Sequence, residues 1–484
     1  DRLRGLGARL LITADGGFRR GRALPLKAIA DAAVDHAPSV ETVVVVRRSG
    51  APVPMRRGRD VAWDDVPTGA APAGLPTAFP SNHPLFLLYS SGTTGEPKAI
   101  VHGTGGYLAW VRATLRWVFD PRPDDVFWCA ADIGWVTGHS YIVFGPLANG
   151  LTSVLYEGAL DHPAPDRMWA IAERYRVNVL YTSPTALRAQ RRRGDANVRA
   201  HDLSALRLLG SVGETINPAV FEWYARVVGG GRCPVVDTWW QTETGGILVS
   251  ATAGLGLVPE RPGSATFALP GIDVDVVRDD GTPSAPGEKG FAVVRRPWPG
   301  LALTLLADDD RFRRTYWTKF PGAYYPGDFA FKDADGYLWF LGRADEVLKV
   351  AGHRLGTIEL EHVLLTHPTV AEAAVCGVPD LEKGEVPVAF VVLREAHGRV
   401  EPRGSDLAEH VAVEIGPFAR PSAVHLVRSL PKTRSGKIMR RVVRAVAEGR
   451  ADIGDVTTLE DEGSVDEIRA ALEAFRRELE RSPP

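Results

Sequence analysis

The sequence predicts an α/β fold: a large N-terminal domain of parallel βα layers plus a β-rich subdomain, with a small mobile C-terminal α+β domain. Between residues 85 and 238, short apolar runs alternate with helix-like segments, which is typical of a parallel sheet covered by helices. After residue 246, glycine- and proline-rich turns separate short strand-like runs. The chain has 484 residues, which is longer than a domain built on a single hydrophobic core, so two or more domains are expected.

Composition and charge exclude several classes of protein. A formal net charge of -2 argues against a nucleic-acid partner, because such proteins carry a basic footprint. No apolar run reaches the roughly 18 residues of a membrane span, and the first residues, DRLRG, are not a signal peptide. The cysteines Cys129, Cys233 and Cys376 have neither disulfide-framework nor zinc spacing, which favours a cytoplasmic protein. The chain opens with Asp rather than Met, which is consistent with a fragment.

Up to about residue 60 the sequence shows one clear apolar strand at residues 43–46, preceded by a helix near residues 26–35. The basic cluster Arg19-Arg20-Gly21-Arg22 stands ahead of that helix, and read alone it is a solvated loop. Residues 70–80 are rich in Pro, Ala and Gly, which predicts a connecting loop.

The α/β region supplies the parallel strands. They are expected at residues 85–89, 126–130, 153–156, 177–181, 206–212 and 235–238. Helices are best supported at residues 107–118, 167–176 and 218–228. Because ligands bind at the carboxyl ends of strands in such sheets, we expect the functional loops to follow these strands directly.

The rest of the chain mixes short strands and helices. In the β-rich part, strands are expected at residues 274–277, 291–294 and 337–341, the last after an Asp335-Gly336 turn whose glycine accepts a positive φ. In the C-terminal part, helices are expected at residues 359–366, 405–415 and 466–481, with a basic helix after the loop 431–437. Strands are expected there at residues 372–378, 386–393 and 423–427. The charged run 342–346 breaks the strand pattern, which predicts a boundary between domains of residues 1–344 and 345–484.

The segment YSSGTTGEPK at residues 89–98 follows an expected buried strand and suits anion binding. Its glycines let the backbone approach a phosphate, its hydroxyl groups add donors, and Lys98 adds a positive charge. The G-x-x-x-x-G-K-[ST] spacing of a P-loop is absent, and by itself the segment is more often a generic Ser/Gly loop.

Four motifs in chain order resemble one superfamily. Residues 89–98 resemble the phosphate loop of the adenylate-forming enzymes: acyl-CoA synthetases, peptide-synthetase adenylation domains and firefly luciferase. Residues 131–140 (ADIGWVTGHS), 237–246 (DTWWQTETGG) and 431–437 (PKTRSGK) are similar to the AMP-forming acetyl-CoA synthetases. The resemblance runs from about residue 10 to the end, without the N-terminal part of the family's large domain. It implies an acetate–CoA ligase: acetate attacks the α-phosphate of ATP, and the thiol of CoA then displaces AMP.

The resemblance implies one catalytic residue in a nucleotide site. Lys437 would bridge the carboxylate and the α-phosphate, because an ionised acid needs positioning and charge neutralisation rather than a base. Read alone, the Ser-Gly-Lys loop is surface. Asp328 would accept the ribose hydroxyls, and Arg343 and Arg354 would contact the nucleotide, the alternative for Arg343 being an ion pair with its acidic neighbours. The other residues implied in ATP or AMP binding are Thr94, Gly213, Glu214, Thr215, Asp237, Thr238, Trp239, Trp240, Gln241 and Thr242.

The implied metal is Mg²⁺ bound to the triphosphate. Glu243 would be its protein ligand, because one carboxylate with phosphate oxygens suits this ion. The sequence has no His/Cys cluster for a transition metal. A second, small cation site would involve Leu365, His367 and Val370, although a His at a helix end is as often a cap.

The acyl pocket can be interpreted by size. The positions that match its lining are Val136, Thr137, Val212 and Trp240. The indole of Trp240 would fill the volume that a longer acyl chain needs. One methylene changes discrimination by roughly 1–3 kcal/mol, so propionate would remain a poor substrate. The alternative for Trp240 is ordinary core packing.

A basic segment implies a CoA site, but other positions of that site differ from the family. Arg19, Arg20, Gly21 and Arg22 resemble the segment that binds the 3′-phosphate of CoA, and Thr137 and Ala351 fall at other CoA positions. The residues that differ from the family's usual ones are Ala351, Ala412, Asp161, Ser183 and Thr215. These differences bear on thioester formation more than on adenylation.

Other functions remain open from the sequence. They are the same chemistry on propionate or another short acid, a non-catalytic adenylate-binding protein, and adenylation followed by transfer to a carrier protein. The joint presence of Asp328, Arg343, Arg354 and Lys437 argues against the non-catalytic alternative. Asp345 resembles the hinge about which the small domain turns, and the resemblance implies control of Lys437 by a lysine acetyltransferase and deacetylase.

Overall fold

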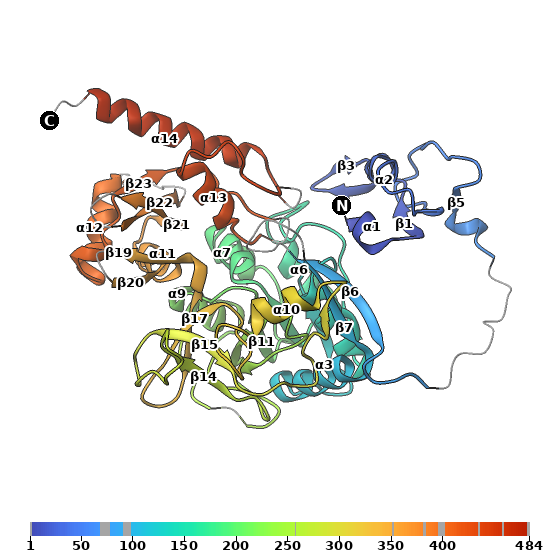
Figure 1. Cartoon of the computed structure of the whole chain (residues 1–484), viewed down its shortest axis with the longest axis horizontal. Helices are drawn as coiled ribbons and strands as arrows, with labels where there is room; N and C mark the ends of the chain where they lie inside the picture. Colours follow the sequence, from blue (N-terminus) through green and yellow to red (C-terminus); the bar gives the residue numbers. More distant parts are fainter. Residues whose placement is uncertain are drawn as a thin grey trace.

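A six-stranded sheet forms the centre of the large domain in the computed structural model (Figure 1). The structure describes residues 2–67, 78–90, 98–256, 258–350, 353–380, 384–394, 402–433, 436–456 and 459–481. The strands are β8 (Val126–Cys129), β9 (Thr152–Ser153), β10 (Val179–Thr182), β11 (Leu208–Val212), β12 (Val235–Trp239) and β13 (Val249–Ser250). Their order is β13-β12-β11-β10-β8-β9, and all pairs are parallel except β12 with β13. The predicted parallel sheet is confirmed.

Both faces of this sheet are buried. The helices of this region include α3 (Thr104–Phe119), α6 (Arg167–Arg174), α7 (Pro184–Arg192) and α9 (Pro218–Trp223). Successive residues of β10 point to opposite faces, so Val179 and Tyr181 join one hydrophobic cluster with Phe119, whereas Leu180 joins another with Trp169. Burial on two faces explains why the strands are almost continuously apolar.

The expected strand at residues 85–89 exists but does not belong to the parallel sheet. It is β6 (Pro84–Ser90), which pairs antiparallel with β7 (Lys98–Gly103), and β16 (Thr304–Leu305) completes a separate sheet. Sequence reasoning missed β7 because two of its buried positions hold Lys98 and His102, which hide the apolar pattern. The segment 91–97 that joins β6 to β7 lies outside the described residues.

The β-rich part contains an antiparallel sheet of four strands. They are β14 (Val274–Val277), β15 (Gly290–Val294), β17 (Asp328–Lys332) and β18 (Leu338–Arg343), in that order. Gly336, between β17 and β18, has a φ of +87°, which confirms the expected Asp-Gly turn.

A separate C-terminal body extends from β19 to α14. Its strands are β19 (Val347–Val350), β20 (His353–Gly356), β21 (Val370–Asp380), β22 (Gly384–Leu393) and β23 (Ala423–Leu426), in one sheet. Its helices are α11 (Thr357–Thr366), α12 (Gly404–Glu414), α13 (Arg440–Ala447) and α14 (Gly463–Arg481). Alternate residues of β22 enter two clusters on opposite faces, with Phe390 in one and Val391 in the other. The predicted helices and strands of this part are confirmed, and the hydrophobic clusters are its own.

An N-terminal unit, from α1 (Arg2–Leu6) to β5 (Asp60–Ala62), lies beside the large domain (Figure 1). The strands β1 (Leu10–Ala14), β4 (Thr42–Val46) and β5 are parallel, with α2 (Leu26–Val34) in between in sequence. The basic cluster is not a plain solvated loop. It forms the hairpin of β2 (Gly17–Arg19) and β3 (Arg22–Leu24), whose turn residues Arg20 and Gly21 have φ of +48° and +75°.

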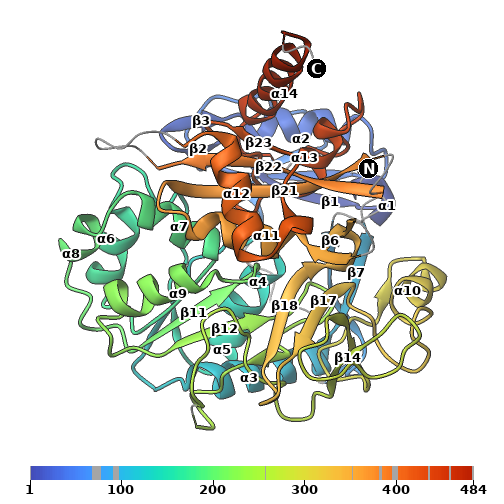
Figure 2. The ribbon, with the colours of Figure 1, turned by 90° about the vertical axis from the view of Figure 1, so that its left-hand side faces the viewer.

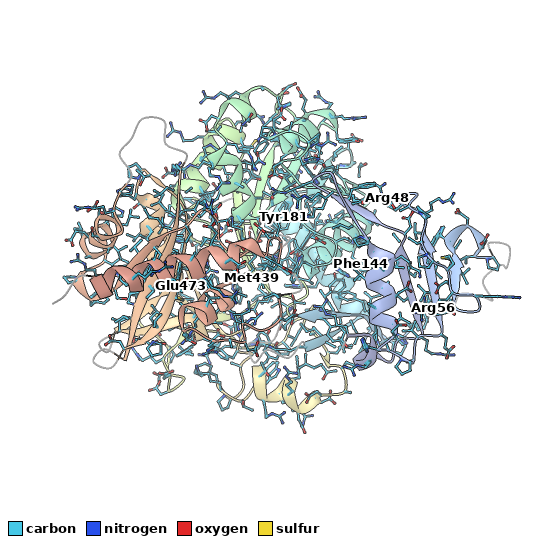
Figure 3. All side chains as sticks on the ribbon, turned by 90° about the horizontal axis from the view of Figure 1, so that it is seen from above. Arg48, Arg56, Phe144, Tyr181, Met439 and Glu473 are labelled. Carbon is cyan, nitrogen blue, oxygen red and sulfur yellow. The ribbon has the colours of Figure 1, made fainter. Side chains whose placement is uncertain are left out.

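The C-terminal body lies over the functional edge of the large domain. Figure 2 shows α11 and the strands of this body above β18 and β11. In the view from above, Tyr181 lies between the C-terminal body, marked by Met439 and Glu473, and the N-terminal unit, marked by Arg48 and Arg56 (Figure 3). Within the described ranges, no helix combines the length and the apolar character needed to cross a membrane.

A glycine substitution tests how tightly the motif after β12 is packed. Gly245 has a φ of +72°, and a Cβ atom there would lie 2.3 Å from the carbonyl oxygen of Gly300. Gly150 has the same φ of +72° but nothing within 4 Å of its Cβ position. We expect Gly150→Ala to cost about 1 kcal/mol of stability from backbone strain alone. Gly245→Ala adds a backbone clash and should cost at least about 3 kcal/mol. Thermal unfolding of both variants measures this, and equal losses would contradict the packing described.

Candidate active site

The carboxylate of Asp328 lies where the two sheets of the large domain meet. Its Oδ2 atom accepts hydrogen bonds from Trp239 Nε1 at 2.9 Å and Gln241 Nε2 at 2.7 Å. Its Oδ1 atom accepts one from Arg343 Nη1 at 3.2 Å. Burial raises the pKa of Asp328, and the charges of Arg343 and Lys437 oppose that rise. Four residues expected in nucleotide binding are thus brought together in one hydrogen-bonded group around Asp328, the residue expected to hold the ribose.

A flat aromatic layer stands next to this carboxylate. Trp239, at the end of β12, stacks on Phe340 of β18 with ring centroids 4.2 Å apart and an interplanar angle of 8°. The hydroxyl of Thr215 donates to the carbonyl of Phe340 at 3.1 Å. A carboxylate beside a planar apolar surface suits a nucleoside, because one binds hydroxyl groups and the other covers a base.

The loop after β11 carries a buried ion pair. Gly213 has a φ of +93°, and the next residue, Glu214, accepts hydrogen bonds from Thr185 at 2.5 Å and from Arg188 at 2.6 Å. Burial alone would raise the pKa of Glu214, but Arg188 and Thr185 hold it at about 2. Sequence reasoning missed both partners, which α7 positions after Ser183 caps its first turn by accepting from Ala186.

The third group lies on the loop after β12 and on β7. Glu243 accepts a hydrogen bond from the hydroxyl of Tyr316, and that hydroxyl also accepts one from Lys98 Nζ at 3.3 Å. Burial lowers the pKa of Lys98, and Glu243 opposes this effect. The role of Tyr316 was not foreseen, because no local motif marks it. The loop backbone is held from β7, where His102 Nε2 donates to the carbonyl of Thr242 at 2.8 Å.

The chemistry of this group fits Mg²⁺ held on a triphosphate. Tyr316 engages only Oε1 of Glu243, and no described residue donates to Oε2. No group of three or more His, Cys, Asp or Glu side chains suited to a metal occurs in the described part of the chain. A cation here would therefore take one protein carboxylate and draw its other oxygens from elsewhere.

The expected acyl-pocket residues lie in one hydrophobic cluster. Val136, Val212 and Trp240 are buried in it, and Thr137 is half-buried in the neighbouring turn. Trp240 Nε1 donates to Tyr181 Oη at 3.1 Å, and the Trp240 ring meets Tyr141 edge-on, with centroids 5.1 Å apart.

Asp237 and Thr238 are buried within the sheet itself. The hydroxyl of Ser211 donates to Asp237 Oδ1 at 2.8 Å, and the hydroxyl of Thr238 donates to the carbonyl of Ser211 at 2.8 Å. Burial raises the pKa of Asp237 to about 7, although Ser211 opposes the rise. The carboxyl group of Asp237 therefore serves the strand interface.

The loop that carries Lys437 faces this site from the C-terminal body. Lys437 N donates to Thr433 Oγ1 at 3.1 Å, and Thr433 N donates to the carbonyl of Lys437 at 2.8 Å. Gly436 has a φ of +88°, and a Cβ there would lie 2.9 Å from Thr185 Cγ2 of α7. Lys437 itself is exposed, and its charge acts on Asp328 and on Glu346. The structure thus brings the expected catalytic lysine to the nucleotide site.

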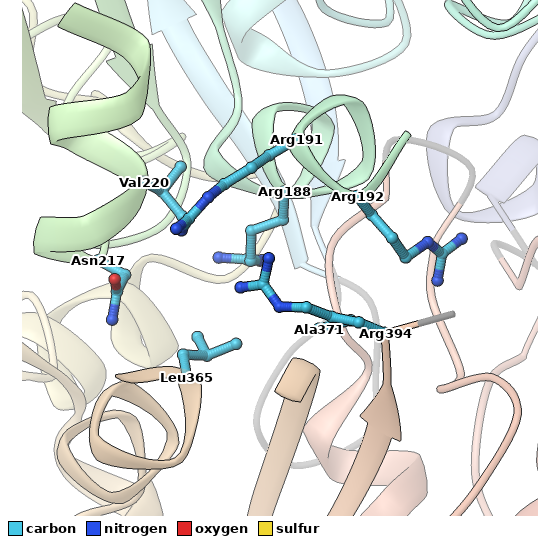
Figure 4. Close-up of a pocket in the computed structure, with 8 residues that line it drawn as sticks. All are labelled: Arg188, Arg191, Arg192, Asn217, Val220, Leu365, Ala371 and Arg394. Atoms are coloured by element: carbon cyan, nitrogen blue, oxygen red, sulfur yellow. The ribbon is translucent and has the colours of Figure 1, made fainter. Parts of the chain in front are cut away.

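Ion pairs connect the C-terminal body to the large domain. Lys289 Nζ lies 2.7 Å from Glu359 of α11, and Arg192 Nη1 lies 3.4 Å from Glu372 of β21. Asn217 Nδ2 donates to the carbonyl of His362 at 3.3 Å. Four arginines line a small pocket between α7 and this body, and Figure 4 shows that three of them come from α7. The pocket is lined by Arg188, Arg191, Arg192, Asn217, Val220, Leu365, Ala371 and Arg394.

The arginines expected to bind CoA lie in the N-terminal hairpin. Arg19 and Arg20 contact Glu460, and Arg20 also contacts Asp161, whereas Arg22 is exposed. Asp161 is held by Arg193 as well.

The second expected cation site lies where α11 ends and β21 begins. Arg394 Nε donates to the carbonyl of Val370 at 3.0 Å, and Val370 N donates to the carbonyl of His367 at 3.1 Å. The His367 ring pairs with Thr369 Oγ1 at 2.8 Å, and Leu365 is buried. The carbonyl oxygens of His367 and Val370 thus each accept a hydrogen bond from a protein donor.

The remaining expected residues are placed as follows. Asp345 is exposed in the 3₁₀ turn Ala344–Glu346 between β18 and β19, and Arg343 Nε lies 3.5 Å from its carboxylate. The expected ion pair of Arg343 therefore coexists with its contact to Asp328. Arg354 lies in β20 opposite Lys349. Thr94 and Ala351 lie outside the described residues.

Comparison with known proteins gives one consistent set of relatives. A model of the AMP-binding enzyme family matches residues 1–304, and one of the AMP-binding enzyme C-terminal domain matches residues 359–437. The chain is 54% identical to a Pyrobaculum aerophilum protein named acetyl-coenzyme A synthetase, over 100% of this chain and 72% of that protein. It is 51% identical to a Rubrobacter xylanophilus protein of the same name, over 98% of this chain and 74% of that protein. It is 50% identical to a Streptomyces avermitilis protein of that name, over 98% of this chain and 72% of that protein.

Asp237 should make stability depend on pH. Its folded pKa of about 7 lies above the ordinary value of 3.8, so the folded state binds the proton more tightly than the unfolded state. Stability is therefore expected to fall as pH rises from about 4 to 7, by at most about 1.4 kcal/mol per pH unit. Asp237→Asn removes this dependence. The melting temperature of the variant minus that of the parent protein should therefore be larger at pH 8 than at pH 5. Equal differences at both pH values would contradict the prediction.

Proposed function

The chain belongs to the AMP-binding enzyme family, and we propose that it is an AMP-forming acetate–CoA ligase. It converts ATP, acetate and CoA to acetyl-CoA, AMP and diphosphate through acetyl-adenylate. One observation carries this proposal beyond family membership: the loop of Lys437 packs against α7 and faces Asp328. The observation supports a joint role for Lys437 and Asp328, which are 109 residues apart in sequence (437 minus 328).

In the first half-reaction, a carboxylate oxygen of acetate attacks the α-phosphorus of ATP, and the bond to diphosphate breaks. Acetate is already ionised near neutral pH, so no base is required. Asp328 orients the nucleoside through its hydroxyl groups, and Lys437 neutralises charge on the reacting oxygens. Arg343 fixes Asp328 and adds a second positive charge beside it. These groups position reactants rather than transfer protons.

Glu243 is the residue we propose as protein ligand of Mg²⁺. Its Oε2 atom, to which no described residue donates, and its position after β12, next to Lys98, support this assignment. When bound, the ion supplies charge neutralisation on the triphosphate. Tyr316 orients the carboxylate of Glu243, which is its proposed contribution.

In the second half-reaction, the thiolate of CoA attacks the acetyl carbonyl and AMP leaves. We propose that the C-terminal body, residues 345–484, first turns about Asp345 relative to residues 1–344. The exposed position of Asp345 in a short turn between two strands supports this, because a hinge needs only a few residues that can change φ and ψ. Arg19, Arg20, Gly21 and Arg22 are the proposed contacts of the CoA 3′-phosphate.

Two further proposals concern the setting of the enzyme. The three cysteines are free and buried, which supports a reducing compartment such as the cytoplasm. The exposed side chain of Lys437, on a loop, supports control by a lysine acetyltransferase and deacetylase, because acetylation would remove its charge.

Lys437→Ala separates the two half-reactions. We expect acetate-dependent ATP–diphosphate exchange to fall by at least about 100-fold, because a charge that stabilises the transition state is lost. Conversion of supplied acetyl-adenylate and CoA to acetyl-CoA should stay within a few-fold. Lys432→Ala, whose ammonium group pairs with Glu372, is the control from the same loop. Equal loss of both half-reactions would contradict the role of Lys437 in adenylation. If the acetyl group is transferred to a carrier protein but not to CoA, the protein is an adenylating enzyme that serves a carrier protein and not a CoA ligase.

Trp240→Ala tests the acyl pocket. Removing the indole should raise the kcat/KM ratio of butyrate to acetate by about 10- to 100-fold, since roughly 1–3 kcal/mol separates acids that differ by one methylene. Trp169→Ala is the control, because Trp169 is also buried but lies in the cluster on the other face of the sheet. Both variants lose stability, so the ratio of acids is measured rather than the rate alone. A parent enzyme that already prefers butyrate would show the assignment of Trp240 to be wrong.

A further inference from the structure

Two arginines of the N-terminal hairpin share one carboxylate oxygen of the C-terminal body. Arg19 Nη2 lies 3.3 Å and Arg20 Nη2 lies 3.5 Å from Oε1 of Glu460. The side chains of Arg19 and Glu460 are 27% and 26% exposed, so water only partly surrounds this contact. The turn at Arg20 and Gly21 presents both guanidinium groups on the same side as Glu460.

The surroundings of this contact are those of an anion site. Arg20 Nη2 also lies 3.0 Å from Asp161 Oδ2, and Asp161 is paired with Arg193. Arginine and carboxylate groups therefore alternate, with Glu460 as the outermost anion. Guanidinium groups bind carboxylate and phosphate oxygens by the same kind of charge-assisted hydrogen bond. Where Glu460 binds, a phosphate oxygen binds by the same chemistry.

Glu460 is attached to the loop that carries Lys437. Glu460 N donates to the carbonyl of Lys432 at 2.8 Å, and Leu459 forms a β-bridge with Thr433. Leu459 is also buried in the cluster of the C-terminal body. Glu460 therefore moves with residues 431–437, although its two arginine partners belong to the N-terminal unit.

We propose that Glu460 occupies the place of the CoA phosphate while Lys437 is in the adenylation site, and so orders the two half-reactions. The proposal rests on the proposed ligase function and on the assignment of Arg19 and Arg20 to CoA. When the C-terminal body turns, Lys437 leaves the nucleotide and Glu460 leaves the arginines in one movement. The arginines are then open to the phosphate at the moment when the thiol is needed.

The competition works in both directions. CoA that binds these arginines disfavours the orientation in which Glu460 holds them, and Glu460 lowers the apparent affinity for CoA by the same factor. The contact is partly exposed, and pairs of this kind contribute factors of about 2 to 5 each. The expected effect is therefore a modest change in the binding of one substrate and not a change in chemistry.

Glu460→Gln tests the proposal, because it keeps the shape of the side chain and removes its charge. We expect the KM for CoA to fall about three-fold. The KM for dephospho-CoA, which lacks the 3′-phosphate, should fall by less, because it responds only to the change in orientation. Glu462→Gln is the matched control: Glu462 is exposed two residues away, and the described residues give it no ion pair. An unchanged KM for CoA in Glu460→Gln, or an equal fall with dephospho-CoA, would overturn the proposal.

A second variant separates this inference from the function on which it rests. Arg19→Ala is expected to raise the KM for CoA. In the Arg19→Ala background, Glu460→Gln should lower that KM by less than it does in the parent protein, because only Arg20 is then left for Glu460 and the phosphate to share. Arg19→Ala without effect on CoA in an active ligase would overturn the inference and leave the function standing. Absence of acetate-dependent ATP–diphosphate exchange in the parent protein would instead contradict the function.

Discussion

The hydrogen bonds to Asp328 are the interaction on which the site depends, because they join its two halves. Trp239 and Gln241 approach from the parallel sheet, and Arg343 approaches from the antiparallel one. Gly327 makes this possible: it has a φ of +79°, and a Cβ there would lie 2.4 Å from the guanidinium of Arg343. The Gly-Asp pair is thus explained by space for an arginine as well as by a turn. Without the central carboxylate, the half-buried guanidinium of Arg343 and the donors of Trp239 and Gln241 would lose their common acceptor, which is costly where water does not replace it.

The sequence predicts the architecture well where burial is simple. The strands of the parallel sheet are apolar on both faces, so each can be recognised from its own sequence without knowing which strands lie beside it. The loops that follow these strands carry the motifs. The prediction was wrong where polar residues are buried for function. Lys98 and His102 interrupt the apolar pattern of β7 because they serve the loop after β12, and this turned an antiparallel hairpin into an expected parallel strand.

The parts of the site that sequence reasoning missed are long-range partners. Tyr316 reaches Glu243 across 73 positions, and Arg188 reaches Glu214 across 26. Nothing local distinguishes that tyrosine or that arginine from others, since each acquires its role from the fold. The hairpin at Arg20 was missed for another reason: a two-residue turn with positive φ usually contains Asn, Asp or Gly, and Arg is seldom found there.

The distribution of ion pairs explains how the C-terminal body can be positioned on the large domain and still be able to move away from it. Well-buried pairs stay within one body: Arg188 with Glu214 in the large domain and Arg440 with Glu361 in the C-terminal one. Two pairs that cross between bodies, Lys289 with Glu359 and Arg19 with Glu460, are about a quarter to a third exposed. In a third crossing pair, Arg192 with Glu372, the carboxylate is buried, but it also pairs with Lys432 of its own body.

This difference has a thermodynamic consequence. A buried pair that is broken leaves an uncompensated charge in a region of low dielectric, which costs several kcal/mol. An exposed pair that is broken exchanges its partner for water at a cost of about 1 kcal/mol or less. The two clusters of the C-terminal body contain only its own residues, and Val347, next to the proposed hinge, packs against the large-domain cluster of Phe291. The proposed alternation between half-reactions therefore leaves both clusters of the C-terminal body intact, and a single carboxylate such as Glu460 is strong enough to bias it.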